Sequence, residues 1–447
     1  MYDTIFVEEH HRPTVMLAFK YFENDAMSAA SSRGMPVVRV VLEPVVSECT
    51  VMEEIDAGIT GVMDQVVAAL VKTLTAEEKS PQLKGPEKPV RIVFKGTLEE
   101  VNRFFYRRGW TDGLPVIPPT DEAVAEMLTG TDLPPDYLVA KLVPRLGKAT
   151  VERIAINAVV AGCLPTYMPL LIAGVKALVT NRVADMMQVS TGSWAPFWIV
   201  NGPVRKDLNI NDSYGAMNPG NIANATIGRA LTLITRNIRG IRPGIEDMSV
   251  LGHPGKYTMV VAENEEDNPW EPLHVEHGFK KEDSTVTLSF PQSYDDIYSY
   301  GTDDKSLLKT ITCNITPQGL GILGIILTPT NARSLASRGW TKDSIKAHIM
   351  ENARVPWDHH PRYYAGDYLG DESLPPFKPQ DSVPILLRVA NQLHDVPVRL
   401  YVFGGVGSWI GILRGGRDIV TEKAELPANW EKLIQKYKNV VPTYARY

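Results

Sequence analysis

A polar segment rich in proline and glycine divides the chain into two unequal parts. Residues 79–89, KSPQLKGPEKP, have the composition of a linker between domains. We therefore predict a boundary near residue 88, with a partial domain over residues 1–88 and a large domain over residues 89–447. The first part is short, which limits how complete a fold it can form.

The first part alternates strand-like and helical runs. Residues 13–19 and 37–45 are dense in apolar residues, and the second run is typical of a buried parallel strand. Residues 24–33 and 55–74 have helical patterns, the latter with apolar residues at three- and four-residue steps. Two strands and two helices leave sheet edges and helix faces that something else must cover. Either the large domain or another polypeptide must do so.

The large domain shows the same alternation. We predict a strand over residues 91–96 and a helix over residues 97–108, where Thr97 and Glu100 have the spacing of a capping box. Further helices are predicted at 151–162, 168–179 and 222–238, and strands at 258–262, 285–290 and 399–403. An incomplete N-terminal α/β unit followed by a large α/β domain is the predicted fold class.

One segment of the large domain is apolar enough to be considered as a membrane span. Residues 154–179 carry Lys176 as their only charge and are about as long as the ~20 residues that cross a bilayer. Pro165 and Pro169 interrupt the segment, and Pro165 is well placed to start a second helix. We predict a buried helix pair and no membrane contact.

The composition argues against several classes of protein. Lys and Arg number 46 against 52 Asp and Glu, so the chain lacks the basic excess that nucleic-acid binding uses. The three cysteines, Cys49, Cys163 and Cys313, cannot form an even disulfide framework, which suits a reducing compartment. The first residues show no export signal. A cytoplasmic protein without nucleic-acid partners is expected.

Cys163 is the first candidate for chemistry. It follows one predicted helix and precedes the helix that Pro165 should start, so the positive end of the second helix could lower the pKa of its thiol. The alternative is a buried and inert packing residue, because free cysteine is among the most buried residue types.

A long polar loop is the second candidate. Residues 190–230 are rich in Ser, Thr, Asn and Gly and lead into a predicted helix near Ile222, an arrangement that can hold an anion or oxyanion. Trp194 and Trp198 argue against disorder. The substrate-binding residues that we predict, in this loop and near it, are Asp112, Asn157, Ser190, Thr191, Asn201, Lys206, Asn221, Arg229, His253 and Lys256.

Carboxylates at a strand end are the third candidate. The predicted strand 258–262 delivers Glu263 and Glu266 at its end, with His274 nearby. Such groups can act as a general acid and base, or they can bind a divalent metal. Their spacing matches no standard metal motif, so no metal ligands are assigned, and a solvated acidic loop is the plain alternative.

Five motifs of the large domain occur in the same order as in a known family. They are RGWTDGLPVIPPT, ATVERIAINAVVAGC, NGPVRKDLNINDSYGAMNPGNIANATIGRAL, LGHPGKY and AENEEDNPWEPLH. The domain thereby resembles the long form of the UGSC family of (seleno)proteins. The N-terminal part, residues 13–44, resembles the second half of that family's α/β thiol domain, downstream of its (Cys or Sec)-Gly-Ser-Cys signature. That signature does not occur in this chain.

The resemblance implies an enzyme subunit that performs thiol-dependent chemistry, reductive or lytic, on a small polar or anionic molecule. The nucleophile would be Cys163 or, more plausibly, a cysteine on a smaller companion subunit that carries the missing half-domain, while Glu263 or Glu266 moves protons. No cofactor is expected. One alternative is a metal-assisted hydrolase or hydratase that uses Glu263, Glu266 and His274. Another is a non-catalytic scaffold subunit.

Overall fold

The computed structural model describes residues 2–46, 51–80, 90–180, 190–316, 322–360, 363, 377–385, 398–416 and 419–440. Helices alternate with strands that form parallel and mixed sheets, so the predicted α/β fold class is confirmed. Cys49 and residues 81–89 of the predicted linker lie outside the described residues.

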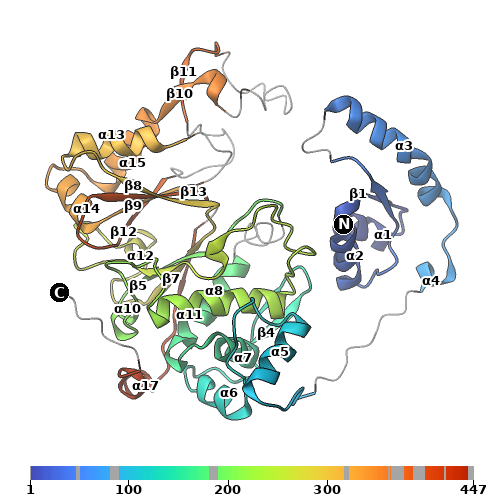
Figure 1. The fold of residues 1–447 in the computed structure, drawn as a ribbon, viewed down its shortest axis with the longest axis horizontal. Coiled ribbons are helices and arrows are strands. Elements are labelled where there is room, and N and C mark those ends of the chain that lie inside the picture. Colours follow the sequence, from blue (N-terminus) through green and yellow to red (C-terminus); the bar gives the residue numbers. More distant parts are fainter. Residues whose placement is uncertain are drawn as a thin grey trace.

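Residues 2–80 form a small N-terminal lobe at the right of Figure 1. Strands β1 and β2 pair in parallel, with Met16 opposite Val40, which agrees with the two predicted strands. Two of the lobe's helices, α2 and α3, match the two predicted helical runs. The elements are α1 (Tyr2–Glu9), β1 (Met16–Phe19), α2 (Glu23–Ser32), β2 (Val40–Glu43), α3 (Met52–Val71) and α4 (Ala76–Lys79).

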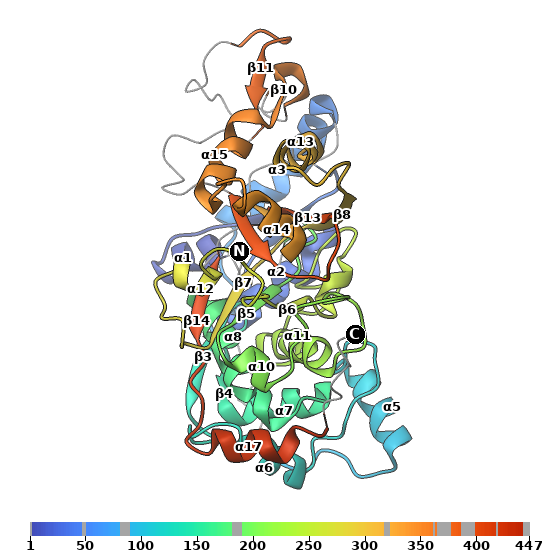
Figure 2. The same ribbon diagram turned by 90° about the vertical axis from the view of Figure 1, so that its left-hand side faces the viewer.

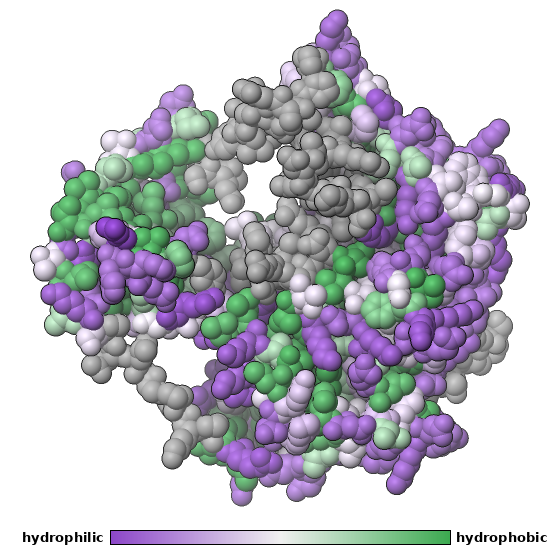
Figure 3. All heavy atoms as spheres, turned by 180° about the vertical axis from the view of Figure 1, so that it is seen from behind, coloured by the Kyte–Doolittle hydropathy of each residue, from purple (hydrophilic) through white to green (hydrophobic). Residues whose placement is uncertain are grey.

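This lobe has a small core and a large exposed apolar surface. Among its described residues the buried apolar side chains are Ile5, Ala18, Ala26, Ala30, Val41 and Val62, half of them alanine. Figure 3 shows apolar side chains gathered over the lobe. The large apolar residues exposed there are Phe6, Leu17, Tyr21, Val46, Val51, Met52, Met63, Val67, Leu70, Val71 and Leu74.

A layer of helices occupies one end of the large domain (Figure 2). Helix α7 ends at Gly162 in the left-handed conformation, and Pro165 starts a 3-10 turn that leads into α8. Both helices are almost entirely buried, so the predicted buried pair is confirmed. In the described parts of the chain, every helix is too short or too polar to cross a membrane. The helices are α5 (Leu98–Arg108), α6 (Asp121–Leu128), α7 (Val151–Ala161), α8 (Met168–Thr180), α11 (Ile222–Ile234) and α17 (Trp430–Tyr437).

The predicted strand over residues 91–96 is wrong. This stretch forms no strand, and Val90 and Ile92 are 70% and 53% exposed. An apolar run becomes a strand only where a neighbouring strand offers its backbone groups, and no strand among the described residues does so for this stretch. The helix that follows is confirmed, with the capping box between Thr97 and Glu100 in place.

Two mixed four-stranded sheets form the centre of the large domain. The first has the order β14-β7-β5-β6, with β5 parallel to β6, and the second the order β12-β9-β13-β8. The sheets pack on each other through a buried apolar cluster that includes Phe197 and Val261 from the first and Tyr401 from the second. Their strands are β5 (Phe197–Asn201), β6 (Val260–Ala262), β7 (Thr285–Ser289), β14 (Val420–Lys423), β8 (Ser293–Tyr298), β9 (Ile322–Leu327), β12 (Val398–Val402) and β13 (Trp409–Gly416).

Shorter elements complete the large domain. Two small antiparallel pairs, β3 with β4 and β10 with β11, lie outside the central sheets. The remaining elements are β3 (Leu138–Leu142), β4 (Gly147–Thr150), α10 (Val204–Asp207), α12 (Leu273–Glu276), α13 (Asp304–Asn314), α14 (Pro329–Ala336), α15 (Lys342–Asn352), β10 (Arg354–Pro356) and β11 (Ser382–Pro384).

Candidate functional site

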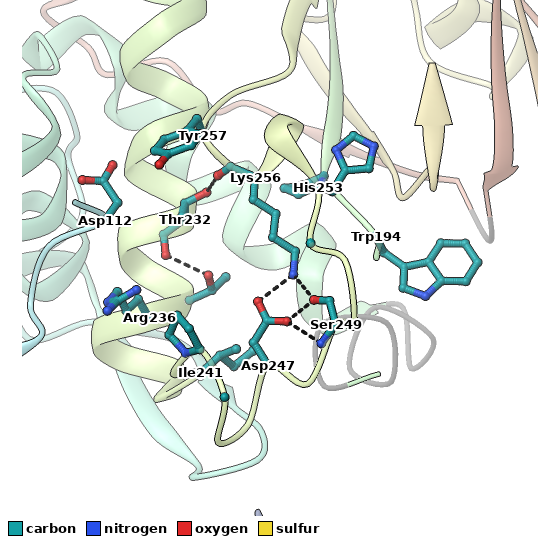
Figure 4. Close-up of a pocket in the computed structure, with 15 residues that line it drawn as sticks. Asp112, Trp194, Thr232, Arg236, Ile241, Asp247, Ser249, His253, Lys256 and Tyr257 are labelled. Carbon is teal, nitrogen blue, oxygen red and sulfur yellow. Dashed lines mark hydrogen bonds and ion pairs between the residues drawn. The ribbon is translucent and has the colours of Figure 1, made fainter. Parts of the chain in front are cut away.

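A cavity of about 340 Å³ lies in the large domain, beside the C-terminal end of α11. Four segments enclose it: the loop after α5, the stretch before β5, the last turns of α11, and the loop between α11 and β6 (Figure 4). Its size is in the range of small-molecule sites. The residues used below as its lining are Asp112, Trp194, Pro196, Thr232, Arg236, Ile241, Pro243, Asp247, Ser249, His253, Lys256 and Tyr257.

Three polar side chains, those of Lys256, Asp247 and Ser249, meet in one hydrogen-bonded network at the centre of Figure 4. The Nζ atom of Lys256 lies 2.6 Å from an oxygen of Asp247 and 2.6 Å from Oγ of Ser249. The hydroxyl of Ser249 also donates to Asp247. An ammonium, a hydroxyl and a carboxylate in mutual contact can pass protons to a bound molecule.

His253 lies at the start of the short 3-10 turn that carries Lys256. Its Nδ1 accepts a hydrogen bond of 2.9 Å from the backbone N–H of Gly255, so the neutral ring carries its proton on Nε2. Burial, together with the nearby Lys256 charge, lowers the pKa of His253. At neutral pH the ring is therefore a neutral donor.

Asp112 lines the cavity on the opposite side, at the left of Figure 4, but its charge is already paired. Arg229 on α11 makes two hydrogen bonds to it, of 2.8 and 3.0 Å. Burial alone would raise the pKa of Asp112, but the Arg229 guanidinium holds it below its usual range. The pair fixes the loop after α5 against α11.

The cavity brings together Asp112, His253 and Lys256 from the predicted binding residues. Thr191 lies close by, because its carbonyl accepts from the backbone N–H of Val250, and Ser190 bonds to the N–H of Gly192.

Three other predicted binding residues have structural partners. Asn157 on α7 accepts a hydrogen bond of 2.8 Å from Asn237, in the turn that follows α11. Asn221 caps the first turn of α11. Lys206 is paired with Glu266.

The predicted acid–base residues lie elsewhere, where β5 and β6 end. Glu263 is fully buried and accepts from Asn201, Asn268 and the N–H of Leu273, at 2.6, 2.9 and 2.8 Å. Burial raises the pKa of Glu263 even though Lys342 lies 4.0 Å away. Asn201 ends β5, Asn268 and Leu273 follow β6, and Lys342 begins α15, so Glu263 links these elements.

Glu266 and His274 belong to the same region. Glu266 pairs with Arg205 and Lys206, at 2.6 and 2.5 Å, and although burial alone would raise its pKa, these cations lower it to about 2. His274 is fully buried, with Nε2 3.4 Å from the carbonyl of Lys281. A carboxylate with so low a pKa is a weak base at neutral pH. None of Glu263, Glu266 and His274 lines the described cavity.

The described residues include no group of three or more His, Cys, Asp or Glu side chains placed to hold a metal ion. Glu263 and Glu266 are occupied by amides, a backbone N–H and cations, as given above. The geometry therefore gives the metal-assisted alternative no support from these residues.

Of the two possibilities that the sequence left open for Cys163, the structure favours the buried packing residue over the acidified thiol. Its side chain is 8% exposed, and its thiol donates to the carbonyl of Thr226 at 3.3 Å. Burial raises the pKa of Cys163 to about 12, because a thiolate would lose its hydration. Sequence reasoning placed Cys163 correctly between two helices. It could not tell whether burial, which raises the pKa of the thiol, would exceed the effect of the helix N-terminus, which lowers it. A thiol in this state is inert at neutral pH.

Sequence reasoning missed Arg236, Asp247 and Ser249. The last two lie in a turn without a recognised motif, and they meet Lys256 only because the chain folds back through the 3-10 turn. Arg236 lies in a π-helical turn, Thr235–Arg239, at the end of α11. No pattern in the sequence predicted this turn.

Comparison of the sequence with family models, with curated proteins and with solved structures found no match.

Proposed function

We propose that this chain is a subunit of an enzyme that acts on a small anionic molecule in the cavity beside α11. The chemistry is thiol-dependent, reductive or lytic, and a companion chain that completes the N-terminal lobe supplies the nucleophilic cysteine. The resemblance to the long UGSC form supports this proposal. The raised pKa of Cys163 makes that cysteine a poor nucleophile, which favours a thiol other than Cys163.

The observation that carries the proposal is the unfinished surface of the N-terminal lobe. One face of α3 packs on β2, with Gly58 close to Glu43 and Val45, and Val62 on the same helix is also buried. A second apolar stripe on the same helix, Met63, Val67 and Leu70, remains exposed. Within the described residues β1 and β2 pair only with each other, so each offers an open edge. A surface of this kind normally has a partner.

A buried carboxylate in the lobe supports the same conclusion. Glu43 ends β2 and is 6% exposed, yet its Oε1 has no hydrogen-bond partner among the described residues. A buried polar atom without a partner is costly, so a donor is expected from whatever covers it. It lies at the carboxyl end of a parallel strand, where α/β sheets place ligands and catalytic groups.

The lobe also lies next to the cavity. Ser28 of α2 donates to Glu246 at 2.6 Å, and Arg145 and Arg242 bond to the same carboxylate at 2.7 Å each. The turn that carries Glu246 lines the cavity through Ile241 and Asp247. A companion that covers the lobe would therefore approach the bound molecule.

Proton transfer in this proposal falls to the network of Lys256, Asp247 and Ser249. When a thiolate attacks and a bond breaks, the leaving atom takes up a proton, and the Lys256 ammonium can donate it. This network lines the cavity. The earlier assignment of that role to Glu263 or Glu266 stays a prediction that the geometry favours less.

Co-expression with the products of neighbouring genes, followed by native mass spectrometry, tests the assembly. We expect a complex with a smaller chain that contains the (Cys or Sec)-Gly-Ser-Cys signature, with an apolar interface above about 2,000 Å². A monodisperse, active homo-oligomer of this chain without a second polypeptide would contradict the proposal.

The scaffold alternative is distinguished by one variant. In an active complex, Lys256→Met should lower turnover by about two to four orders of magnitude while the complex still assembles. Lys305→Met, which removes an exposed lysine of α13 outside the cavity, is the control. Unchanged turnover in Lys256→Met would favour a scaffold role for this chain.

A further inference from the structure

Arg236 occupies an unusual position in the cavity. Its Nε donates to the carbonyl of Gly109 at 2.9 Å, and Gly109 ends α5 in the left-handed conformation that lets this carbonyl turn toward α11. The contact fixes the plane of the guanidinium. Within the described residues, its two terminal nitrogens have no hydrogen bond or ion pair. They remain available to a ligand.

The other charges that line the cavity cancel in pairs. Asp112 is bound by Arg229, and Asp247 is bound by Lys256. His253 is a neutral donor at neutral pH, because its pKa is lowered. The side chains that line the described cavity therefore leave one uncompensated charge, the cation of Arg236. A single planar cation with two free donors matches one carboxylate in a bidentate pair.

The other residues that line the cavity limit the chemical group that a carboxylate bound at Arg236 could carry. Apolar side chains of Pro196, Ile241 and Pro243 line the cavity, together with the aromatic Trp194 and Tyr257. Figure 4 shows Arg236 on one side and the network of Lys256, Asp247 and Ser249 on the other. A molecule held at Arg236 by one end would therefore reach the network with its other end.

We infer that the cavity binds a small monocarboxylate, with its carboxylate on Arg236 and its reacting group next to Lys256. This deepens the proposed function and rests on it for the statement that the cavity is the reaction site. The class excludes dianions, for which the cavity offers no second free cation among its described residues, and it excludes cations, which Arg236 repels.

Benzoate, benzamide and benzylamine are suitable probes, because they share a ring and differ in charge. Calorimetric titration of the full chain, in its complex where one forms, should show binding of benzoate at least about tenfold tighter than of benzamide and no binding of benzylamine. Equal affinity for benzoate and benzamide, tighter binding of inorganic phosphate than of benzoate, or no binding of benzoate would each overturn the inference.

Variants locate the binding. Arg236→Gln should weaken benzoate at least about tenfold, and Arg236→Lys should restore part of the loss, because a lysine keeps the charge without the planar fork. Arg333→Gln removes an exposed arginine that pairs with Asp267 away from the cavity and should change nothing. Benzoate binding that is unaffected by Arg236→Gln contradicts the inference, and so does a comparable loss in Arg333→Gln.

The probe results and the proposed function can fail separately. Benzoate bound at Arg236 by a chain that never acquires a companion would uphold the carboxylate site and contradict the thiol chemistry. A complex that shows thiol-dependent activity but does not bind benzoate would uphold the proposed chemistry and contradict the carboxylate site.

Discussion

At the scale of single residues, Cys163 and Cys313 should differ sharply in reactivity. Cys163 is buried with its pKa raised to about 12, whereas Cys313 on α13 is exposed. At pH 8 only about one Cys163 in ten thousand would be a thiolate. We expect iodoacetamide to modify Cys313 in the native protein and to leave Cys163 unmodified, as peptide mass spectrometry would show. Rapid modification of Cys163 before unfolding would mean that its burial is not stable.

Asp25 on α2 makes stability depend on pH. Burial, and after it the nearby Glu246 charge, raises the pKa of Asp25 from 3.8 to about 6. A carboxyl whose pKa is raised in the folded state contributes stability below pH 4 and loses it as the pH rises through 6. Asp25→Asn should therefore increase the free energy of unfolding at pH 8, by about 1 kcal/mol after solvent screening of this part-exposed side chain. At pH 4 the variant should match the wild type.

Denaturant titrations at both pH values measure this difference. Asn24→Gln, an uncharged change at an exposed position of the same helix, is the control and should change stability equally at both pH values. A stabilisation by Asp25→Asn that is the same at pH 4 and pH 8 would rule out titration as its cause.

At the scale of elements, the contact between α8 and β5 is tight enough to exclude a single methyl group. A Cβ added to Gly174 would lie 2.2 Å from the ring of Trp198, which is fully buried on β5. Since neither the helix nor the sheet can move apart freely, Gly174→Ala should cost about 1–3 kcal/mol. The melting temperature should fall by a few degrees.

Gly61 on α3 is the matched control. It also lies inside a helix, but a Cβ there meets nothing within 4 Å. Gly61→Ala should leave the protein as stable or stabilise the lobe by about 0.5–1 kcal/mol, because alanine restricts the unfolded chain. An equal change of stability in both variants would show that the contact with Trp198 does not set the cost at Gly174.

At the scale of the whole molecule, the exposed stripe on α3 should determine both solubility and assembly. Val67 is 52% exposed and Met63 is 44% exposed, which favours association when no partner is present. Val67→Lys should reduce aggregation of the chain alone and prevent it from binding the companion, as size-exclusion chromatography and co-purification would show. Gln65→Lys, on an exposed polar position of the same helix, should do neither.

Comparison of Val67→Lys with Gln65→Lys shows whether the apolar stripe of α3 is a docking surface or only an exposed apolar surface. If Val67→Lys still co-purifies with a companion as the wild type does, the stripe is not the interface. If both lysine variants disrupt the complex equally, added charge rather than the lost apolar contact is responsible.

Local patterns in the sequence were sufficient for most elements. The capping box at Thr97, the left-handed end of α7 at Gly162 and the start that Pro165 provides each depend on neighbouring residues alone, and each is present. The spacing of apolar residues likewise identified α3 and the parallel strands of the lobe. The strand expected at 91–96 failed because a strand needs a partner that local sequence does not name.

The sequence by itself determined the α/β class and local features such as the capping box at Thr97 and the helix end at Gly162. Only the tertiary structure decided which of the predicted site residues are buried and which charges are paired. Cys163 and Glu263 are buried, and Asp112 forms an ion pair with Arg229. The terminal nitrogens of Arg236 have no partner among the described residues. The reason is that helix caps and periodicity act over a few residues, whereas burial, pKa and charge pairing depend on which distant segments come within a few ångströms.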